Sequence, residues 1–399
     1  MSRILFLAER FPPDIGGLAS SAGRIVRNLC QLGHEVDVLV WSRYLQPGQV
    51  LNGSSELEEH QIESDSSPNP QIYRVGLYRH WDMSMTQTLN VLDWLHSQRS
   101  YQVVWGHYLF PAGFLAVWFA QLNILPSLVS ARGNDVDRGA FPPGDFARLR
   151  WTLEEADLIT SVSEDLAKKI QLVSGRYDTI VLKNAVNTEL FAPTLSAADK
   201  LALRQSLGIG EREVVLGFSG ELREKKGQKF LLQGLTQVRQ HRDACLLIIG
   251  EVRATQEAEL QVYSLQHPED YQRIIITEHL SEPETVAQYL QLCDVFLLPS
   301  LWEGLPNALL EAMSCSLGCI ASDAGGIPEV IVAGETGFLV SRSQLHRLGE
   351  AILEYLELDE EKRKLIGEAA RDLIVSEFSL AAEKRRLQKA IARLIPNDS

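Results

Sequence analysis

Short runs of Val, Ile and Leu alternate with longer amphipathic stretches along this chain. The apolar run RILFLA at residues 3–8 precedes the amphipathic stretch 18–33, and EVDVLVW at 35–41 follows it. Nearly continuous apolar strands separated by helices are typical of a parallel sheet that helices cover on both faces. The pattern therefore predicts an α/β fold.

A second series of the same kind begins with VVLGFSG at 214–220 and continues through CDVFLLPS at 293–300. The usual size of about 100–200 residues per domain fits two domains in this chain. We expect Rossmann-like domains at residues 1–186 and 187–378, facing each other across a cleft. The remaining segment, 379–399, is predicted to form a helix from Leu380 to about Leu394 with Ser379 as its cap, and to pack back on the first domain.

One segment breaks the alternation. Residues 46–70 are rich in Ser, Pro, Asn and Glu. This composition predicts a long surface loop.

Two glutamates, Glu303 and Glu311, stand in the mostly apolar stretch PSLWEGLPNALLEAMS. Pro306 is expected to open a helix, because its missing N–H costs nothing at that position. The free N–H groups of a helix start can hold a phosphate, and Glu311 on the same helix can accept hydrogen bonds from a sugar diol. The alternative is that Glu303 only complements the helix dipole and Glu311 lies on a solvated face.

Basic residues gather after another predicted strand. Arg223, Lys225 and Lys226 follow Gly220 and precede a helix, where cations are well placed to neutralise a diphosphate. A charge run of this kind is also common in a solvated turn. The chain contains neither GxGxxG nor GxxxxGK[ST], so a Rossmann dinucleotide fingerprint and a P-loop have no support.

Three further candidates lie near predicted strand ends of the first domain. Gly16 and Gly17 precede a helix and allow a ligand to approach the backbone, although Gly-Gly serves any tight turn. His107 can handle a proton or bind a hydroxyl, although a single histidine is often structural. Asp135 and Asp137 have the spacing of a metal-binding DxD pair, but ion pairs or helix caps also explain them.

The composition is that of an ordinary soluble protein, with 45% hydrophobic and 23% charged residues. A formal net charge of −14 argues against a nucleic-acid partner, which needs clustered Lys and Arg. The five cysteines and the short N-terminal apolar run indicate reduced thiols and a cytoplasmic location. No apolar span is long enough to cross a bilayer, which leaves open weak peripheral membrane contact.

Together the motifs resemble the retaining glycosyltransferases of family 4, which have the GT-B fold. The stretch from Asp294 to Val340 looks like that family's E-x7-E region followed by a Gly-Gly-x-Pro-Glu turn at residues 325–329. Weaker likeness appears in FPPDIGG, LGHEVDVLV, SVSEDL and KNAVNTELF.

The resemblance implies a donor site in the second domain. That site would comprise Gly17, Gly220, Arg223, Lys226, Glu303, Gly304, Leu305, Asn307, Ala308, Leu310 and Glu311, with Gly17 bordering it from the first domain. Catalytic roles are predicted for Glu303, Lys226, Arg223, His107 and Arg132. The family offers little guidance on the acceptor, which we expect to bind the first domain at Gly16, His107, Tyr108, Arg132 and Asp135. The chain departs from the family at Glu221, at Arg132 where histidine is common, and at the 184–187 hinge. The family often has an arginine where this chain has Glu221, directly after Gly220. We expect Arg223 to supply the positive charge of that missing arginine.

The predicted activity is transfer of a sugar from a nucleotide-diphosphate sugar to a glycan, lipid-linked or small-molecule acceptor. No metal or other cofactor is expected, and a front-face retaining reaction is preferred, because no carboxylate stands out as a nucleophile. Two alternatives stay open at this point: a nucleotide-sugar epimerase of similar fold, and a catalytically silent subunit that binds nucleotide. The expected setting is cell-surface or exopolysaccharide assembly.

Overall fold

The computed structural model describes residues 2–53, 68–139 and 142–395. The chain divides into two compact units, which are each described by themselves. The first unit comprises Met1–Asn184 and Glu383–Ser399, and the second comprises Ala185–Ala382. The sequence predicts that the first domain ends at residue 186 and that the second domain ends at residue 378. In the structure the first unit is left after Asn184 and re-entered after Ala382.

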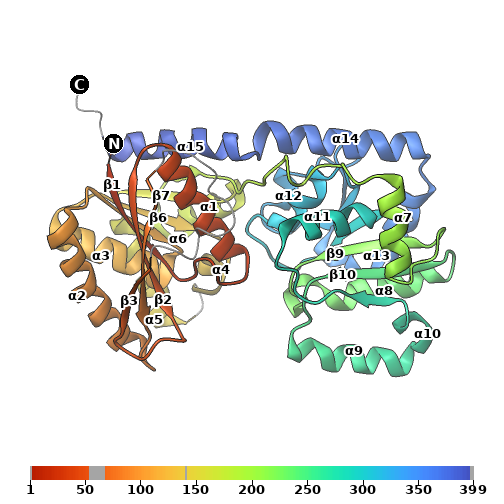
Figure 1. Ribbon diagram of the computed structural model, residues 1–399, viewed down its shortest axis with the longest axis horizontal. Coiled ribbons are helices and arrows are strands. Elements are labelled where there is room, and N and C mark those ends of the chain that lie inside the picture. The colour runs from red at the N-terminus through yellow and green to blue at the C-terminus, as the bar shows by residue number, and fades with distance from the viewer. Residues whose placement is uncertain (1, 54–67, 140–141, 396–399) are drawn as a thin grey trace. The chain divides into compact units, whose positions relative to one another are not determined.

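The first unit is built on a sheet with the strand order β3-β4-β2-β1-β5-β6-β7-β8. Figure 1 labels β1, β2, β3, β6 and β7 of this sheet. Its strands are β1 (Arg3–Ala8), β2 (Glu35–Ser42), β3 (Val50–Gly53), β4 (Gln71–Gly76), β5 (Val103–His107), β6 (Ser127–Ala131), β7 (Leu158–Ser161) and β8 (Ile180–Val181). Its helices are α1 (Gly17–Gln31), α2 (Trp81–Arg99), α3 (Phe114–Asn123), α4 (Asn134–Gly139), α5 (Pro143–Glu155) and α6 (Glu164–Ser174), with α15 (Leu380–Leu394) returning from the far end of the chain. All neighbouring strands are parallel except β3 and β4.

The first sheet is covered on both faces, as the central strand β1 illustrates. Ile4 and Phe6 belong to a buried cluster with α1 and α15, whereas Leu5 and Leu7 belong to another with α2 and α3. Side chains of a strand alternate between its faces, so a strand that is apolar throughout needs two such layers. The predicted parallel sheet with helices on both sides is confirmed.

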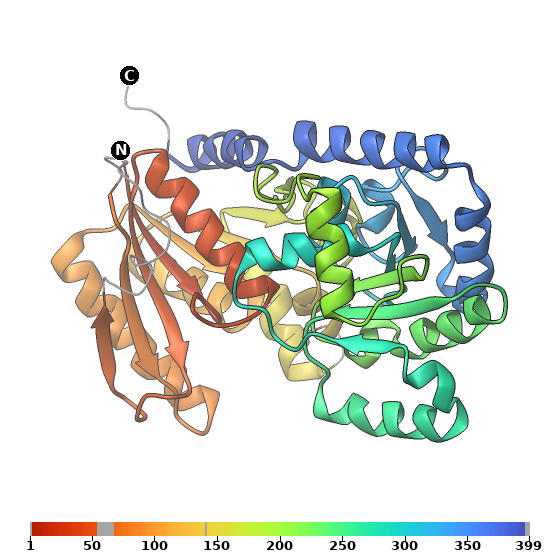
Figure 2. The ribbon, with the colours of Figure 1, turned by 45° about the vertical axis from the view of Figure 1, so that its right-hand side comes forward.

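The last helix is an integral part of the first unit. It begins at Leu380, and the side chain of Ser379 accepts a hydrogen bond from the amide of Ala382, so the predicted helix and its cap are confirmed. Leu387, which is fully buried, packs in the same cluster as residues of α1. The ribbons of α15 and α1 lie side by side in Figures 1 and 2. The core of the first unit therefore includes residues of α15, although this helix follows the second unit in the sequence.

The second unit has a parallel sheet in the order β11-β10-β9-β12-β13-β14. Its strands are β9 (Val214–Ser219), β10 (Ala244–Ile249), β11 (Ile274–Ile276), β12 (Val295–Leu298), β13 (Cys319–Ser322) and β14 (Phe338–Val340). Its helices are α7 (Ala197–Ser206), α8 (Gln228–Arg239), α9 (Ala254–Gln266), α10 (Pro268–Tyr271), α11 (Pro283–Leu292), α12 (Asn307–Ser314), α13 (Leu348–Glu357) and α14 (Glu360–Glu377).

The prediction of a continuous loop at residues 46–70 is wrong in part. Val50–Gly53 forms the strand β3, which pairs with β4 in antiparallel register, Val50 opposite Val75. A short polar strand can form at the edge of a sheet, because an edge strand pairs its backbone with one neighbouring strand only. Residues 54–67 of the predicted loop lie outside the described part of the chain.

Candidate active site

Three loops meet at the carboxyl edge of the second sheet, after β9, β12 and β13. The amide of Leu301 donates to the carbonyl of Lys225 over 2.8 Å, and the amide of Gly326 donates to the carbonyl of Gly304, also over 2.8 Å. The hydroxyl of Ser322 donates to the carbonyl of Ser300 over 2.6 Å. These bonds bring together predicted donor-site stretches that are far apart in the sequence.

Two glycines permit this close approach of backbone to backbone. Gly227 has φ of +77°, and a Cβ there would stand 2.1 Å from the carbonyl oxygen of Pro299. Gly325 has φ of +53°, and its Cβ would stand 1.9 Å from the carbonyl oxygen of Glu303. Only glycine fits at either position without displacing the neighbouring loop.

Glu303 lies at the centre of the three loops and is buried, with 8% of its surface exposed. The Nζ of Lys226 is 2.6 Å from its Oε1, which also accepts a 2.9 Å hydrogen bond from the hydroxyl of Ser300. The Nζ of Lys225 is 3.9 Å from its Oε2. Sequence reasoning identified Glu303 and Lys226, but it missed Ser300.

The charge of this cluster follows from its contacts. Burial alone would raise the pKa of Glu303, but Lys226, Lys225 and the hydrogen bonds outweigh it and hold the pKa below the usual 4.5. Glu303 is therefore ionised at neutral pH. Two ammonium groups around one carboxylate leave an excess positive charge, which suits an anionic ligand.

The start of α12 lies next to this cluster and is open to an anion. Pro306 precedes the helix, no side chain caps it, and its first turn contains no acidic residue. The first amides of a helix lack partners within the helix and carry partial positive charge, so they can hold a phosphate.

The predicted donor residues on and just before α12 differ in how far their side chains are buried. Asn307, Ala308 and Glu311 are half-buried and share one helical face, because positions three and four apart lie together. Leu305 and Leu310 are buried, at 5% and 0% exposure. The two leucines can therefore offer a ligand only their backbone.

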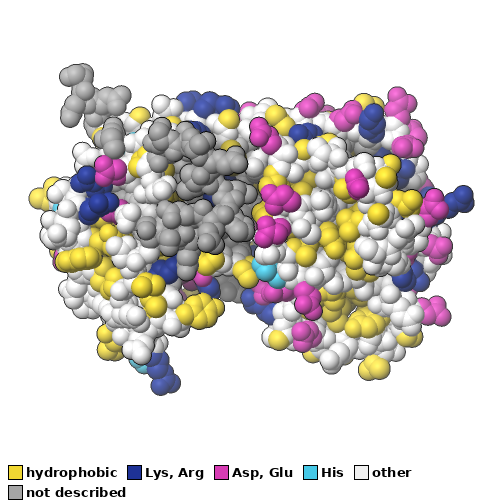
Figure 3. Space-filling view, viewed as in Figure 1, with side chains coloured by type: hydrophobic (Ala, Val, Ile, Leu, Met, Phe, Trp, Pro, Cys, Tyr) yellow, Lys and Arg dark blue, Asp and Glu magenta, His cyan; other side chains and the backbone are white. Residues whose placement is uncertain are grey.

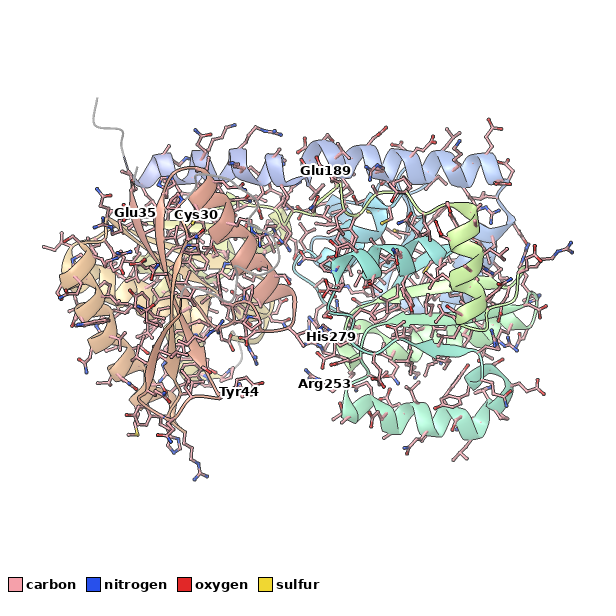
Figure 4. The ribbon with its side chains drawn as sticks, in the orientation of Figure 1. Cys30, Glu35, Tyr44, Glu189, Arg253 and His279 are labelled. Carbon is pink, nitrogen blue, oxygen red and sulfur yellow. The ribbon has the colours of Figure 1, made fainter. Side chains whose placement is uncertain are left out.

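Arg223 has a different setting from the one expected. Its Nε lies 2.7 Å from a carboxylate oxygen of Glu221. Arg253, labelled in Figure 4 just before α9, is also 2.7 Å from Glu221. Glu221 thus holds both arginines at the end of β9, near Gly220, and Lys225 is the additional cation that reaches Glu303.

In the first unit, the predicted glycines form the start of α1. Gly16 has φ of +120° and is exposed, as is Gly17. No side chain caps α1 and its first turn contains no acidic residue. The backbone there is accessible, as a ligand contact requires.

The sequence predicts that His107 handles a proton or binds a hydroxyl, or that it is structural. Its side chain is fully buried at the end of β5, where Nε2 lies 3.0 Å from the hydroxyl of Ser21 and the ring stacks on Phe6 at 5.5 Å. Burial, with Arg132 and Arg24 nearby, lowers the pKa of His107 well below 6.5, so the ring is neutral. These contacts fit the structural alternative, and the role in proton transfer stays a prediction.

Asp135 makes structural contacts in the loops that follow β5 and β6. Its carboxylate accepts hydrogen bonds from the amides of Leu109, Arg132 and Gly133 at 2.8–3.2 Å, and it is 7% exposed. Burial raises its pKa to about 6, although the backbone amides oppose the shift. Its role in acceptor binding stays a prediction.

The remaining acceptor candidates are Tyr108 and Arg132, both half-buried after β5 and β6. Arg132 donates a hydrogen bond to the side chain of Asn184. Asp137 of the DxD pair is 2.9 Å from Lys169. Over the described ranges, no three His, Cys, Asp or Glu side chains group in a way that would hold a metal ion.

Comparison with known proteins identifies the class. Residues 16–184 match the family model of the glycosyl transferase 4-like domain, and residues 199–373 match that of glycosyl transferases group 1. Together the two models account for most of both units. The chain belongs to the glycosyltransferases of family 4 and is an enzyme with the GT-B fold.

The curated relatives match the chain almost end to end. It is 24% identical to N-acetyl-alpha-D-glucosaminyl L-malate synthase of Bacillus anthracis, over 92% of this chain and 91% of that one. It is 25% identical to a GDP-mannose-dependent monoacylated alpha-(1-6)-phosphatidylinositol monomannoside mannosyltransferase of Corynebacterium glutamicum, over 96% of both.

Solved structures agree on the fold. HepE of Anabaena in complex with UDP-glucose superposes with a TM-score of 0.80 at 19% identity, covering 99% of this chain and 100% of that one. Sucrose-phosphate synthase of Thermosynechococcus elongatus gives 0.78 at 19% identity, covering 99% of each.

In the part of the chain that the structure describes, no helix combines the length and the apolar character of a membrane span.

Proposed function

We propose that the enzyme transfers a sugar from a nucleotide-diphosphate sugar to a hydroxyl of a glycan, lipid-linked or small-molecule acceptor, with retention of configuration. The observation that carries this proposal is the positively charged cluster of Lys225, Lys226 and Glu303 beside the open start of α12. The similar proteins support it, since they include a GDP-mannose-dependent mannosyltransferase and a structure in complex with UDP-glucose.

In this proposal the diphosphate binds the first amides of α12 and the ammonium group of Lys226. Glu311, one turn into α12, accepts hydrogen bonds from the ribose hydroxyls. Glu303 holds Lys226 in place and faces the sugar. The acceptor is assigned to the first unit, at the strand ends where Gly16, Tyr108 and Arg132 lie.

The reaction breaks the bond between the anomeric carbon and the diphosphate oxygen. The acceptor hydroxyl attacks from the same face and forms the new glycosidic bond, and the departing phosphate oxygen takes its proton. Lys226, Lys225 and the α12 amides stabilise the charge that develops on the diphosphate, a type of contribution worth about 3–4 kcal/mol per donor. Because these groups supply positive charge at the leaving group, the proposed reaction needs no metal ion.

The donor is tested by a thermal-shift screen with UDP-, GDP- and ADP-sugars. A ligand that binds only the folded protein raises its stability with concentration, by about 2.7 kcal/mol at a hundredfold excess over Kd. The best donor is then incubated with and without candidate acceptors. Nucleotide release that depends on an acceptor supports transfer, whereas conversion of the donor without one would indicate an epimerase.

Replacing Glu311 separates the proposed ribose contact from general charge effects. Glu311→Ala should weaken binding of the nucleotide about 10- to 100-fold, since hydrogen bonds to a charged group contribute about 1.5–3 kcal/mol. Glu357→Ala, an exposed acid on α13, is the matched control. Equal nucleotide Kd values for both variants, measured by calorimetry, would disprove the assignment of Glu311.

A further inference from the structure

A groove of about 360 Å³ lies on the first unit, between α2 and the edge of the sheet formed by β3 and β4. Its α2 side consists of Gln87, Asn90, Val91 and Trp94, which recur three and four residues apart and so form one stripe of the helix. The opposite side includes Tyr73 of β4. None of the predicted site residues lines this groove.

Trp94 is the main apolar group of the groove. Its side chain is 54% exposed, while Tyr73 is 6% exposed and meets the Trp94 ring edge-on at 6.4 Å. Hydrophobic side chains reach the surface over α2 in Figure 3. A large aromatic ring that is fixed by a neighbour and still open to solvent is a typical contact surface for a ligand.

Among the described residues, the polar lining comprises three side-chain amides and the phenol of Tyr73. Asn52 of β3 lies directly opposite Tyr73 in the strand register, and Asn90 and Gln87 face it from α2. The Nε2 of Gln87 donates to the carbonyl of Gly48 over 2.7 Å, whereas its Oε1 is buried without a hydrogen-bond partner in the described structure. A buried acceptor without a partner costs free energy, because it has lost its hydrogen bonds to water.

This combination defines the chemistry of the ligand. Side-chain amides both donate and accept hydrogen bonds, as sugar hydroxyls do, and none of the described residues that line the groove is charged. The faces of sugar rings expose C–H groups with partial positive charge, which pack on the electron-rich face of an aromatic ring. A charged ligand would find no counter-ion, and a purely apolar one would leave the amides unpaired.

We propose that the groove between α2 and β3 binds a neutral glycan, with Trp94 as the stacking platform and Asn52, Asn90 and Gln87 as hydrogen-bond partners. The groove is separate from the residues assigned to the donor and the acceptor. It is suited to hold a sugar chain during transfer, and its binding needs no nucleotide.

The test is titration calorimetry of the full chain, without nucleotide, against maltohexaose, cellohexaose and α-1,6-mannohexaose. Trp94→Ala should weaken binding of the preferred hexasaccharide at least tenfold, which corresponds to about 1.4 kcal/mol. Trp94→Tyr keeps an aromatic face and should retain most of the affinity. Trp118→Ala removes another half-exposed tryptophan, on α3, and should leave the affinity unchanged.

Each other result overturns the proposal. Failure of all three hexasaccharides to bind, or equal losses in Trp94→Ala and Trp118→Ala, would exclude a glycan site at this groove. If Trp94→Ala instead abolished self-association in sedimentation experiments and left glycan affinity intact, the groove would be a contact between copies of the chain. Thermal unfolding of every variant verifies that it is folded. Because nucleotide binding is measured separately, a failed donor screen leaves this result interpretable.

Discussion

At the scale of single residues, the ion pair of Glu303 and Lys226 shows what the sequence can predict. Both residues follow parallel strands, whose carboxyl ends share one edge of a sheet, so their proximity follows from the strand pattern. The inward turn of Lys225 and the contact with Ser300 depend on the 3₁₀ turn Glu224–Lys226 and on loop packing. Residue periodicity carries no information about either.

Removing the ammonium group of Lys226 tests the charge at this site. Lys226→Ala should lower kcat about 100- to 1,000-fold, because one stabilising donor for the leaving diphosphate is lost. Lys229→Ala, an exposed lysine three residues later, is the control and should keep its activity. Steady-state kinetics with saturating donor distinguishes the two, and an unchanged kcat in Lys226→Ala would refute the proposed role.

The buried His107 makes stability depend on pH. Its folded pKa lies well below 6.5, so as pH falls the unfolded chain binds the proton first. The stability that the neutral His107 contributes is fully present above about pH 6.5. As the pH falls below that value, this stability is lost at up to about 1.4 kcal/mol per pH unit. Urea unfolding at pH 7.0 and 5.5 should show a smaller loss in His107→Gln than in the parent.

The control for this prediction is His241→Gln. His241 is exposed at the end of α8, so its replacement should leave the pH dependence of the parent unchanged. If His107→Gln lost as much stability between the two pH values as the parent, the buried ring would not be the source.

At the scale of elements, prediction succeeded where one local signal decides the outcome. The helix at Leu380–Leu394 and its Ser379 cap are such a case. Prediction failed for β3, because four exposed residues have no apolar pattern and pair only through the backbone of β4. The sequence pattern also carries no sign that His107 and Asp135 are buried, because their burial depends on elements distant in sequence.

The contact between the β12 and β13 loops is tested at Gly325. Gly325→Ala should lower the midpoint of thermal unfolding, because an added Cβ would clash with the carbonyl of Glu303. Gly334→Ala is a matched control, since its φ of +80° is also positive but no atom lies within 4 Å of its Cβ. Strain at positive φ costs about 1–3 kcal/mol, so the excess loss in Gly325→Ala reports the clash. Equal midpoints would contradict the close packing.

At the scale of the whole molecule, the two units differ in how the chain forms them. The second unit is one continuous stretch, Ala185–Ala382, whereas the first combines residues up to Asn184 with those from Glu383 onward. The sequence predicts the return of the last helix only through its amphipathic pattern and its position beyond the second sheet. Its place in the core of the first unit depends on contacts with α1 and β1, which are distant in sequence.

Truncating Leu387 tests the contribution of α15. Leu387→Ala should destabilise the first unit by about 2–5 kcal/mol, the usual cost of such a change in a core. Lys389→Ala, exposed on the same helix, should have little effect. Amide hydrogen exchange localises the change, since protection should fall in β1 and α1. Loss of protection confined to α15 itself would show that the core does not depend on it.

The return of α15 also determines the order in which the protein matures on the ribosome. Synthesis proceeds at about 5–20 residues per second, so the final helix emerges about 10–40 s after the rest of the first unit. Until then the surface of α1 and β1 that Leu387 covers lacks its partner, and the second unit, which ends at Ala382, receives its last residues just before α15. The half of the enzyme whose translation begins first is therefore the half whose sequence is completed last.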